Sequence, residues 1–177
     1  IFKPFRVGDL IQVGERYYGT VEDITLRHTV IADFENKRVI IPNATIGKET
    51  IKNDNINDNR ICKWVEVGVS YDSDLQLAID ILRSVCENHP MCIDARTASD
   101  KQKGLPKVVI RVKGFGDSSI DLRAMVWVND AHKGFQMHSE INQKLKEEYD
   151  RQGVEIPFPH RTIYMKTPVE VTQESKL

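Results

Sequence analysis

The 177-residue sequence lacks the features that mark several common protein classes. It has only three cysteines, Cys62, Cys86 and Cys92, and an odd number without a CxxC pair does not predict a disulfide framework. Its formal net charge of −1 gives no general attraction to nucleic acid or to an anionic membrane. No apolar run approaches the roughly 18 residues that a membrane-spanning helix needs. These features predict a soluble chain in a reducing, cytosolic environment.

Residues arranged for catalysis or metal binding are also missing. The five histidines are scattered, and none pairs with another at the spacing of a helical metal site. The segment "YDSD" (71–74) places two carboxylates where a helix begins; helix capping explains them, and a Mg²⁺ site or an acid–base pair is the alternative. "GFGDSS" (114–119) lies between two predicted strands, whereas a phosphate-binding glycine loop leads into a helix. We therefore predict no enzyme, no cofactor and no metal site.

Residues 1–52 predict a small all-β domain. Short runs rich in β-branched residues alternate with turns, and no helical period is present. Pro42 ends the predicted strand 39–41 because proline cannot donate to a β-ladder. Several strands of about five residues at this spacing are typical of a strongly bent barrel. The Asn- and Asp-rich stretch that follows has little to bury and predicts a linker over 53–60.

Residues 61–158 predict a second domain of mixed structure. Strands are expected at 62–70, 107–116 and 118–129, and a loop at 93–106. The first helix follows "YDSD", with Ser73 and Gln76 at capping-box spacing, and the second helix spans 132–152 with Gly153 as its C-terminal cap. With the extended piece "VEIPFP", this gives the order β-α-β-β-α-β of a ferredoxin-like fold. A short strand at 161–166 and a polar tail complete the final segment, 159–177.

Six segments of the sequence together resemble one family. They are "PFRVGDLIQV", "GTVEDITLRHTVI", "NKRVIIPNATIG", "VGVSYDSD", "FGDSSI" and "GVEIPFP", in this order and spacing. The chain is similar over roughly residues 2–166 to the cytoplasmic part of the small-conductance mechanosensitive channel (MscS) family. The resemblance implies an α+β protein: an Sm-like β domain, then the ferredoxin-like domain, then a C-terminal strand that joins a narrow barrel.

The resemblance also implies a function without catalysis. In this family the cytoplasmic parts assemble as a homoheptamer into a hollow vestibule below the pore, with lateral portals between neighbouring subunits. The vestibule filters ions and supports assembly and gating during osmotic stress. A pore-lining transmembrane helix is then expected before Ile1, with the chain on the cytoplasmic side of the inner membrane. The candidate portal residues are charged: Asp58, Arg60, Lys63, Asp100, Lys101 and Lys103.

A soluble Sm-like and ferredoxin-like protein that binds RNA or a small regulatory ligand is the alternative function. Tyr17 and Tyr18 could stack on bases. However, residues 1–60 contain nine Lys or Arg and nine Asp or Glu, so this region has no basic excess for nucleic acid. An all-β unit of about 50 residues is also near the lower limit for independent stability. Pairing its edge strands with a second copy would enlarge its core, which favours a homo-oligomer.

Overall fold

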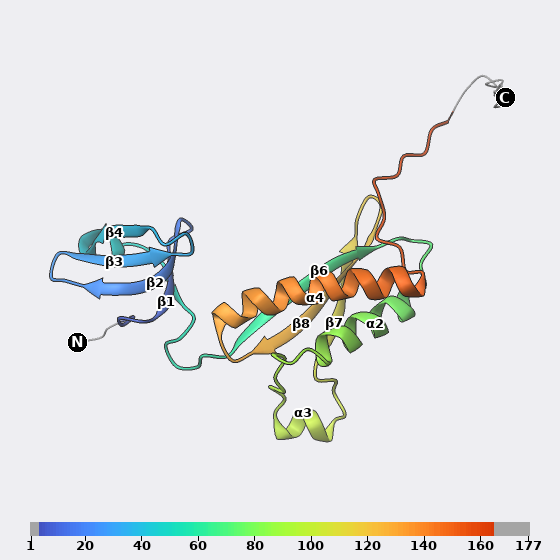
Figure 1. Cartoon of the computed structure of the whole chain (residues 1–177), viewed down its shortest axis with the longest axis horizontal. Helices are drawn as coiled ribbons and strands as arrows, with labels where there is room; N and C mark the ends of the chain where they lie inside the picture. The colour runs from blue at the N-terminus through green and yellow to red at the C-terminus, as the bar shows by residue number, and fades with distance from the viewer. Residues whose placement is uncertain (1–3, 165–177) are drawn as a thin grey trace.

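The first domain is a five-stranded antiparallel sheet in the computed structural model, which describes residues 4–164 (Figure 1). Its elements are β1 (Leu10–Val13), β2 (Tyr17–Ile24), β3 (His28–Asp33), β4 (Arg38–Pro42), α1 (Asn43–Ile46) and β5 (Ile51–Asn53), with the strand order β4-β3-β2-β1-β5. A β-bulge between Val21 and Asp23 bends β2. Within the described residues the edge strands β4 and β5 are not paired with one another. The all-β domain is therefore confirmed, and its bent sheet does not close between β4 and β5 within the described residues.

The second domain is a three-stranded antiparallel sheet with two long helices on one face (Figure 1). Its elements are β6 (Ile61–Val69), α2 (Leu75–Glu87), α3 (Ala98–Gln102), β7 (Val109–Phe115), β8 (Ile120–Val128) and α4 (Ala131–Gln152), with the strand order β6-β8-β7. Along β8 buried and half-buried side chains alternate without interruption, because only one face meets α2 and α4. The other sheet face is uncovered within the described part of the chain.

The ferredoxin-like order is present up to α4. Beyond it, residues 154–158 run beside the end of β6 and form no strand, although Val154 is buried and Ser70 N donates to Glu155 O at 2.9 Å. Residues 161–164 of the expected C-terminal strand are likewise not in a strand, and residues 165 and 166 lie outside the described residues. A strand needs a neighbouring strand to pair with, and within the described chain residues 161–164 have none. This strand stays a prediction.

Two local predictions need correction. Asp74, not Ser73, caps α2: its carboxylate accepts a hydrogen bond from Leu77 N at 3.0 Å. Ser73 Oγ is engaged elsewhere, because it accepts from Glu155 N at 3.0 Å and fixes the chain after α4. The predicted loop 93–106 contains the short helix α3, which a Thr97–Asp100 capping box begins.

The core of the second domain lies between α2, α4 and the sheet. The predicted apolar face of α4 is confirmed, since Met137, Ile141, Leu145 and Tyr149 are all buried. Cys86 on α2 is buried with them, as a small packed side chain. Helix α4 ends at Gly153, whose φ of 75° lies in the left-handed region that glycine favours. No helix in residues 4–164 has both the length and the apolar composition to cross a membrane.

Candidate functional site

Asp58 and Arg60, two of the predicted portal residues, form one ion pair in the linker. The Arg60 guanidinium donates from Nε at 3.0 and 2.9 Å and from Nη2 at 2.6 Å to the Asp58 carboxylate. These hydrogen bonds lower the pKa of Asp58 to about 2, so the carboxylate stays ionised at physiological pH. Because the two charges are in contact, each largely cancels the field of the other beyond a few ångströms. The pair marks the linker but leaves little charge to act on a passing ion.

Lys63 is not free at the surface but covers an aromatic ring. Its Nζ lies 3.6 Å from the centroid of the Phe135 ring on α4. Partial burial in this contact lowers the pKa of Lys63. A cation held on a ring face is an established structural contact, so the position of Lys63 is explained without an ion portal.

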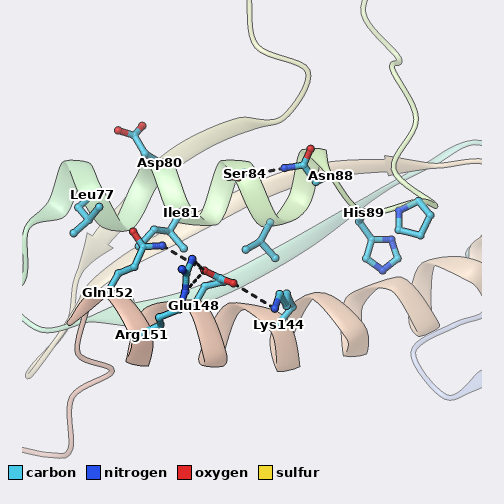
Figure 2. Close-up of a pocket in the computed structure, with 12 residues that line it drawn as sticks. Leu77, Asp80, Ile81, Ser84, Asn88, His89, Lys144, Glu148, Arg151 and Gln152 are labelled. Carbon is cyan, nitrogen blue, oxygen red and sulfur yellow. Dashed lines mark hydrogen bonds and ion pairs between the residues drawn. The ribbon is translucent and has the colours of Figure 1, made fainter.

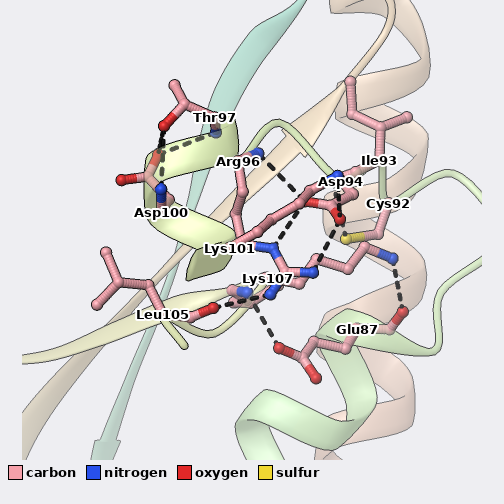
Figure 3. Close-up of polar contacts among 11 residues, drawn as sticks. Glu87, Cys92, Ile93, Asp94, Arg96, Thr97, Asp100, Lys101, Leu105 and Lys107 are labelled. Carbon is pink, nitrogen blue, oxygen red and sulfur yellow. Dashed lines mark hydrogen bonds and ion pairs between the residues drawn. The ribbon is translucent and has the colours of Figure 1, made fainter. Parts of the chain in front are cut away.

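The long loop 93–106, here called the arm, is braced by its own charges (Figure 3). Arg96 donates to Asp94 from Nε and Nη2, both at 2.8 Å, and from Nη1 to Leu105 O at 2.8 Å. Asp94 also pairs with Lys101 at 3.4 Å. The Arg96 guanidinium holds the pKa of Asp94 well below its usual range. The arm is thus a fixed projection.

The predicted portal residues of the arm have different roles. Asp100 completes the capping box of α3, accepting from Thr97 N at 2.9 Å and from Thr97 Oγ1 at 2.7 Å. Lys101 is held by Asp94 (Figure 3). Lys103 caps the C-terminal end of α3 and is exposed. The structure therefore separates the six candidates: Asp58 and Arg60 lie in the linker, Lys63 on β6, and Asp100, Lys101 and Lys103 in the arm.

The uncovered face of the second sheet carries a charge cluster that our sequence analysis missed. Trp64, Glu66, Arg111, Lys113 and Arg123 make up this cluster, here called the open face. Strand register places Arg123 opposite both Glu66 and Arg111, so the three form a row across β6, β8 and β7. Glu66 accepts from Lys113 Nζ at 2.9 Å and from Arg123 Nε at 2.6 Å.

The open face has more positive than negative charge. Its three cations outnumber the two carboxylates of this face, Glu66 and the neighbouring Asp121 on β8. Both Lys113 and Arg123 lower the pKa of the Glu66 carboxyl by hydrogen bonding to it. The Arg123 guanidinium lies 3.9 Å over the Trp64 ring, and Arg111 is exposed. The signal was present in the sequence, because Trp64 and Glu66 alternate with buried valines along β6, and that alternation predicts one wet face.

A groove of about 600 Å³ between α2 and α4 is the main hollow on the helical side (Figure 2). Its charged groups satisfy one another: Glu148 pairs with Lys144 at 3.3 Å, pairs with Arg151, and accepts from Gln152 Nε2 at 3.4 Å. This pairing engages the charged groups that α4 brings to the groove, so these groups offer no free charge to a ligand. In residues 4–164 no cluster of three His, Cys, Asp or Glu could hold a metal ion.

Two family models match this chain. One, described as mechanosensitive ion channel, beta-domain, matches residues 1–55, and the other, mechanosensitive ion channel MscS, C-terminal, matches residues 65–156. The two matches fall on the two domains that the structure shows. The order of the two matches along the chain is thus the order of the all-β domain and the α/β domain in the structure.

Similar proteins and structures carry related names. An uncharacterized MscS family protein of Archaeoglobus fulgidus is 28% identical over 98% of this chain and 57% of its own length. The large-conductance mechanosensitive channel MscMJLR of Methanocaldococcus jannaschii is 30% identical over 93% of this chain and 44% of its own length. The crystal structure of Helicobacter pylori MscS in its closed state matches with a TM-score of 0.78 and 25% identity, over 93% of this chain and 60% of that one. The chain thus spans about half the length of the curated relatives it matches.

Proposed function

The chain belongs to the MscS family of mechanosensitive ion channels, and from this premise we propose that it forms the wall of a hollow ion vestibule below the pore. In this proposal the full-length protein sits in the inner membrane, this part lies on its cytoplasmic side, and the vestibule filters ions and supports gating during osmotic stress. The match of both domains to channel family models carries the proposal. The relatives are named channels, so they do not favour an RNA-binding protein.

A homo-oligomer, which we propose is a heptamer, fits the shape of the first domain. Its sheet ends in two edge strands, β4 and β5. Each pairs with one neighbouring strand, and within the described chain no strand pairs with its outer edge. Ile40 on β4 is 64% exposed, an unusual position for an isoleucine in an isolated domain. Pairing edge to edge around a ring would satisfy the backbone groups of both strands and cover such side chains.

The end of the first domain near the N-terminus is the side that we propose faces the membrane-spanning part. Val7 and Leu26 are 59% and 99% exposed there. Next to Val7 lies a largely apolar cavity of about 680 Å³, whose wall includes Phe5 and Ile24. Apolar side chains gathered at one end indicate a contact with another apolar surface. An upstream transmembrane segment or the bilayer surface would provide it.

The open face is our candidate for the ion-filtering surface. It is the uncovered side of the sheet, and a vestibule acts on ions through charges that line the water they cross. The exposed Arg111 is its sharpest test, because it lies in the row with Arg123 and extends the excess of positive charge. Asp58, Arg60, Lys63, Asp100, Lys101 and Lys103 remain weaker candidates, since most are engaged in the contacts described above.

The test is the ion preference of the full-length channel in a patched membrane with a salt gradient. Arg111→Glu is expected to shift the reversal potential toward cation preference, because it reverses a charge on the proposed lumenal surface. Lys146→Glu is the matched control: Lys146 is exposed on α4, on the opposite side of the sheet, and its reversal is expected to leave the potential unchanged. An equal shift for both variants, or none for Arg111→Glu, would exclude the open face from the ion path.

Oligomeric state is tested separately by light scattering of the given chain over a concentration series. A species near seven times the 20.3 kDa chain mass is the expected result. A smaller assembly of fixed size would correct the subunit number. A monomer at every concentration would show that the outer edges of β4 and β5 do not pair between copies of this chain in solution.

A further inference from the structure

Four ring side chains from the two domains meet beside the linker. Tyr18 on β2 and Phe34 after β3 come from the first domain, and His132 and Phe135 come from the first turns of α4. The Phe34 ring lies at the centre, with centroids 5.3 Å from Tyr18, 5.8 Å from His132 and 5.2 Å from Phe135. All three pairs are edge-to-face, the arrangement that aromatic rings prefer. We call these four residues the aromatic joint.

The first domain presents its half of the joint rigidly. The turn that carries Phe34 is closed by Asp33, whose Oδ1 accepts from Glu35 N at 2.9 Å and from Lys37 N at 2.8 Å. Tyr18 is fixed at its other end, because its hydroxyl donates to Asp54 Oδ2 at 2.6 Å. Neither ring therefore has to be ordered when the contact forms, which reduces the entropic cost of docking.

The second domain presents its half just as firmly. Helix α4 begins at Asp130, whose side chain accepts from Lys133 N at 3.1 Å. Gly134 lets the helix approach β6 closely, since a Cβ there would lie only 3.1 Å from side-chain atoms of both Ile61 and Lys63. The next residue is Phe135, and Lys63 Nζ covers its ring at 3.6 Å. The ring is held between its own helix, a cation and Phe34.

Direct hydrogen bonds and ion pairs do not connect the two domains within the described residues. In the described chain, 4–164, no hydrogen bond or ion pair runs from residues 4–53 to residues 61–164. The start of the linker is tied back to the first domain, because Asp54 N donates to Leu10 O at 3.0 Å and Leu10 N donates to Asn55 Oδ1 at 2.7 Å. The relative orientation of the domains therefore depends on the remaining linker and on the aromatic joint.

We propose that the aromatic joint docks the first domain onto the start of α4, so that the two domains move as one body. A displacement of the β domain is then passed to the helical domain, and the linker does not absorb it. The joint also explains two exposed rings, because Phe34 and Phe135 remain 54% and 41% exposed yet face each other across the domain boundary. This inference does not depend on the channel function, and it is tested in solution.

Cross-linking within the full chain is the first test. Glu35→Cys and Lys133→Cys, exposed positions beside the joint on each domain, are introduced together with Cys62→Ser, so that all four rings stay in place and only the buried Cys86 and Cys92 remain as background thiols. A flexible bismaleimide is expected to link positions 35 and 133 within one chain, seen as a faster-migrating single-chain band on a denaturing gel. Glu35→Cys with Phe115→Cys is the control, since Phe115 is 75% exposed on β7, outside the joint. No link between positions 35 and 133, links only between chains, or equal linking in the control would overturn the proposal.

Cleavage by trypsin after Arg60 in the linker is the second test, and it needs no new cysteine. Cleavage reports the population of the undocked state when docking is fast relative to cutting. One edge-to-face pair shifts an equilibrium by about two- to tenfold, so Phe34→Ala and Phe135→Ala are each expected to speed cleavage within that range. The double variant is expected to be cleaved faster than either single variant but by less than the product of the two effects, because the Phe34–Phe135 pair is shared while the Phe34–His132 and Tyr18–Phe135 pairs are lost separately.

Two further variants make the cleavage result specific. Phe135→Tyr keeps the ring and is expected to retain the original rate, and Phe115→Ala removes an exposed ring elsewhere and is also expected to do so. Circular dichroism establishes that each variant is folded. Unchanged cleavage in folded Phe34→Ala and Phe135→Ala would overturn the joint and leave the proposed channel function untouched.

Discussion

Tyr149 allows the packing of the helical layer to be tested by a substitution of one atom. The side chain is completely buried, and its hydroxyl donates to the backbone oxygen of Ala78 at 3.0 Å, which joins α4 to α2. Tyr149→Phe removes that hydrogen bond and keeps the ring. We expect the free energy of unfolding to fall by about 0.5–1.5 kcal/mol, the net value of one such bond. For a domain of about 100 residues this corresponds to a melting temperature lowered by roughly 2–12 °C.

Tyr149→Ala is the matched comparison, because it removes the ring as well. Loss of a buried aromatic ring costs about 3–5 kcal/mol, so this variant is expected to melt far below Tyr149→Phe. Urea unfolding followed by circular dichroism measures both changes. If Tyr149→Phe cost as much as Tyr149→Ala, or if it cost nothing, the hydroxyl would not make the bond to Ala78 on which the estimate depends.

The pH dependence of the same variant gives an independent measurement. Burial raises the pKa of the Tyr149 phenol above its usual value near 10. The stability from the neutral buried phenol is complete below about pH 10 and is lost as the pH rises further, since the unfolded phenol ionises first. The parent chain is therefore expected to lose up to about 1.4 kcal/mol more per pH unit above pH 10 than Tyr149→Phe does. Parallel stability curves for the two proteins would contradict a buried, neutral Tyr149.

One glycine substitution and one cysteine reaction test two further features of the second domain, the end of α4 and the burial of Cys86. Gly153→Ala is expected to destabilise it by about 1–2 kcal/mol, because φ is 75° and an added Cβ meets nothing within 4 Å, so the cost is one of backbone conformation alone. Gly47→Ala, at φ −65°, is the control, and an equal loss of stability in both would contradict this reason. Cys86 is expected to resist iodoacetamide at pH 8, because burial raises the pKa of its thiol to about 12, while the half-buried Cys62 reacts faster; equal rates by mass spectrometry would show that α2 opens readily.

Much of the fold followed from local patterns whose physical causes act over a few residues. The apolar face of α4 repeats with the helical period, and Gly153 supplies the backbone conformation that ends the helix. The strand pattern of β6 likewise separates a buried face from a wet one. These signals depend on neighbours in sequence, so they can be recognised before any tertiary contact is known.

The parts that sequence reasoning missed depend on contacts between distant residues. Asp74 caps α2, whereas the hydroxyl of Ser73 accepts a hydrogen bond from the backbone of Glu155, 82 residues later in the chain. Helix α3 has only five residues and forms within a charge network that Arg96 ties to Leu105. A run of five residues has too weak a helical period to be recognised, and a network is not visible as a motif.

The same distinction separates the six charged candidates from the open face, the surface that we propose filters ions. The six candidates were chosen because they are charged and lie between the domains or in the long loop, at positions that the family resemblance places near a portal. In the structure the charge of Asp58 is balanced by Arg60, and the Lys63 ammonium lies on the Phe135 ring. These charged groups are therefore engaged in contacts within the chain. The open face, in contrast, places Arg123 and Arg111 side by side on a rigid sheet, where the cations outnumber the carboxylates of Glu66 and Asp121. A surface that acts on ions needs charge left over after internal pairing, and in the described chain the second sheet provides it more clearly than the linker does.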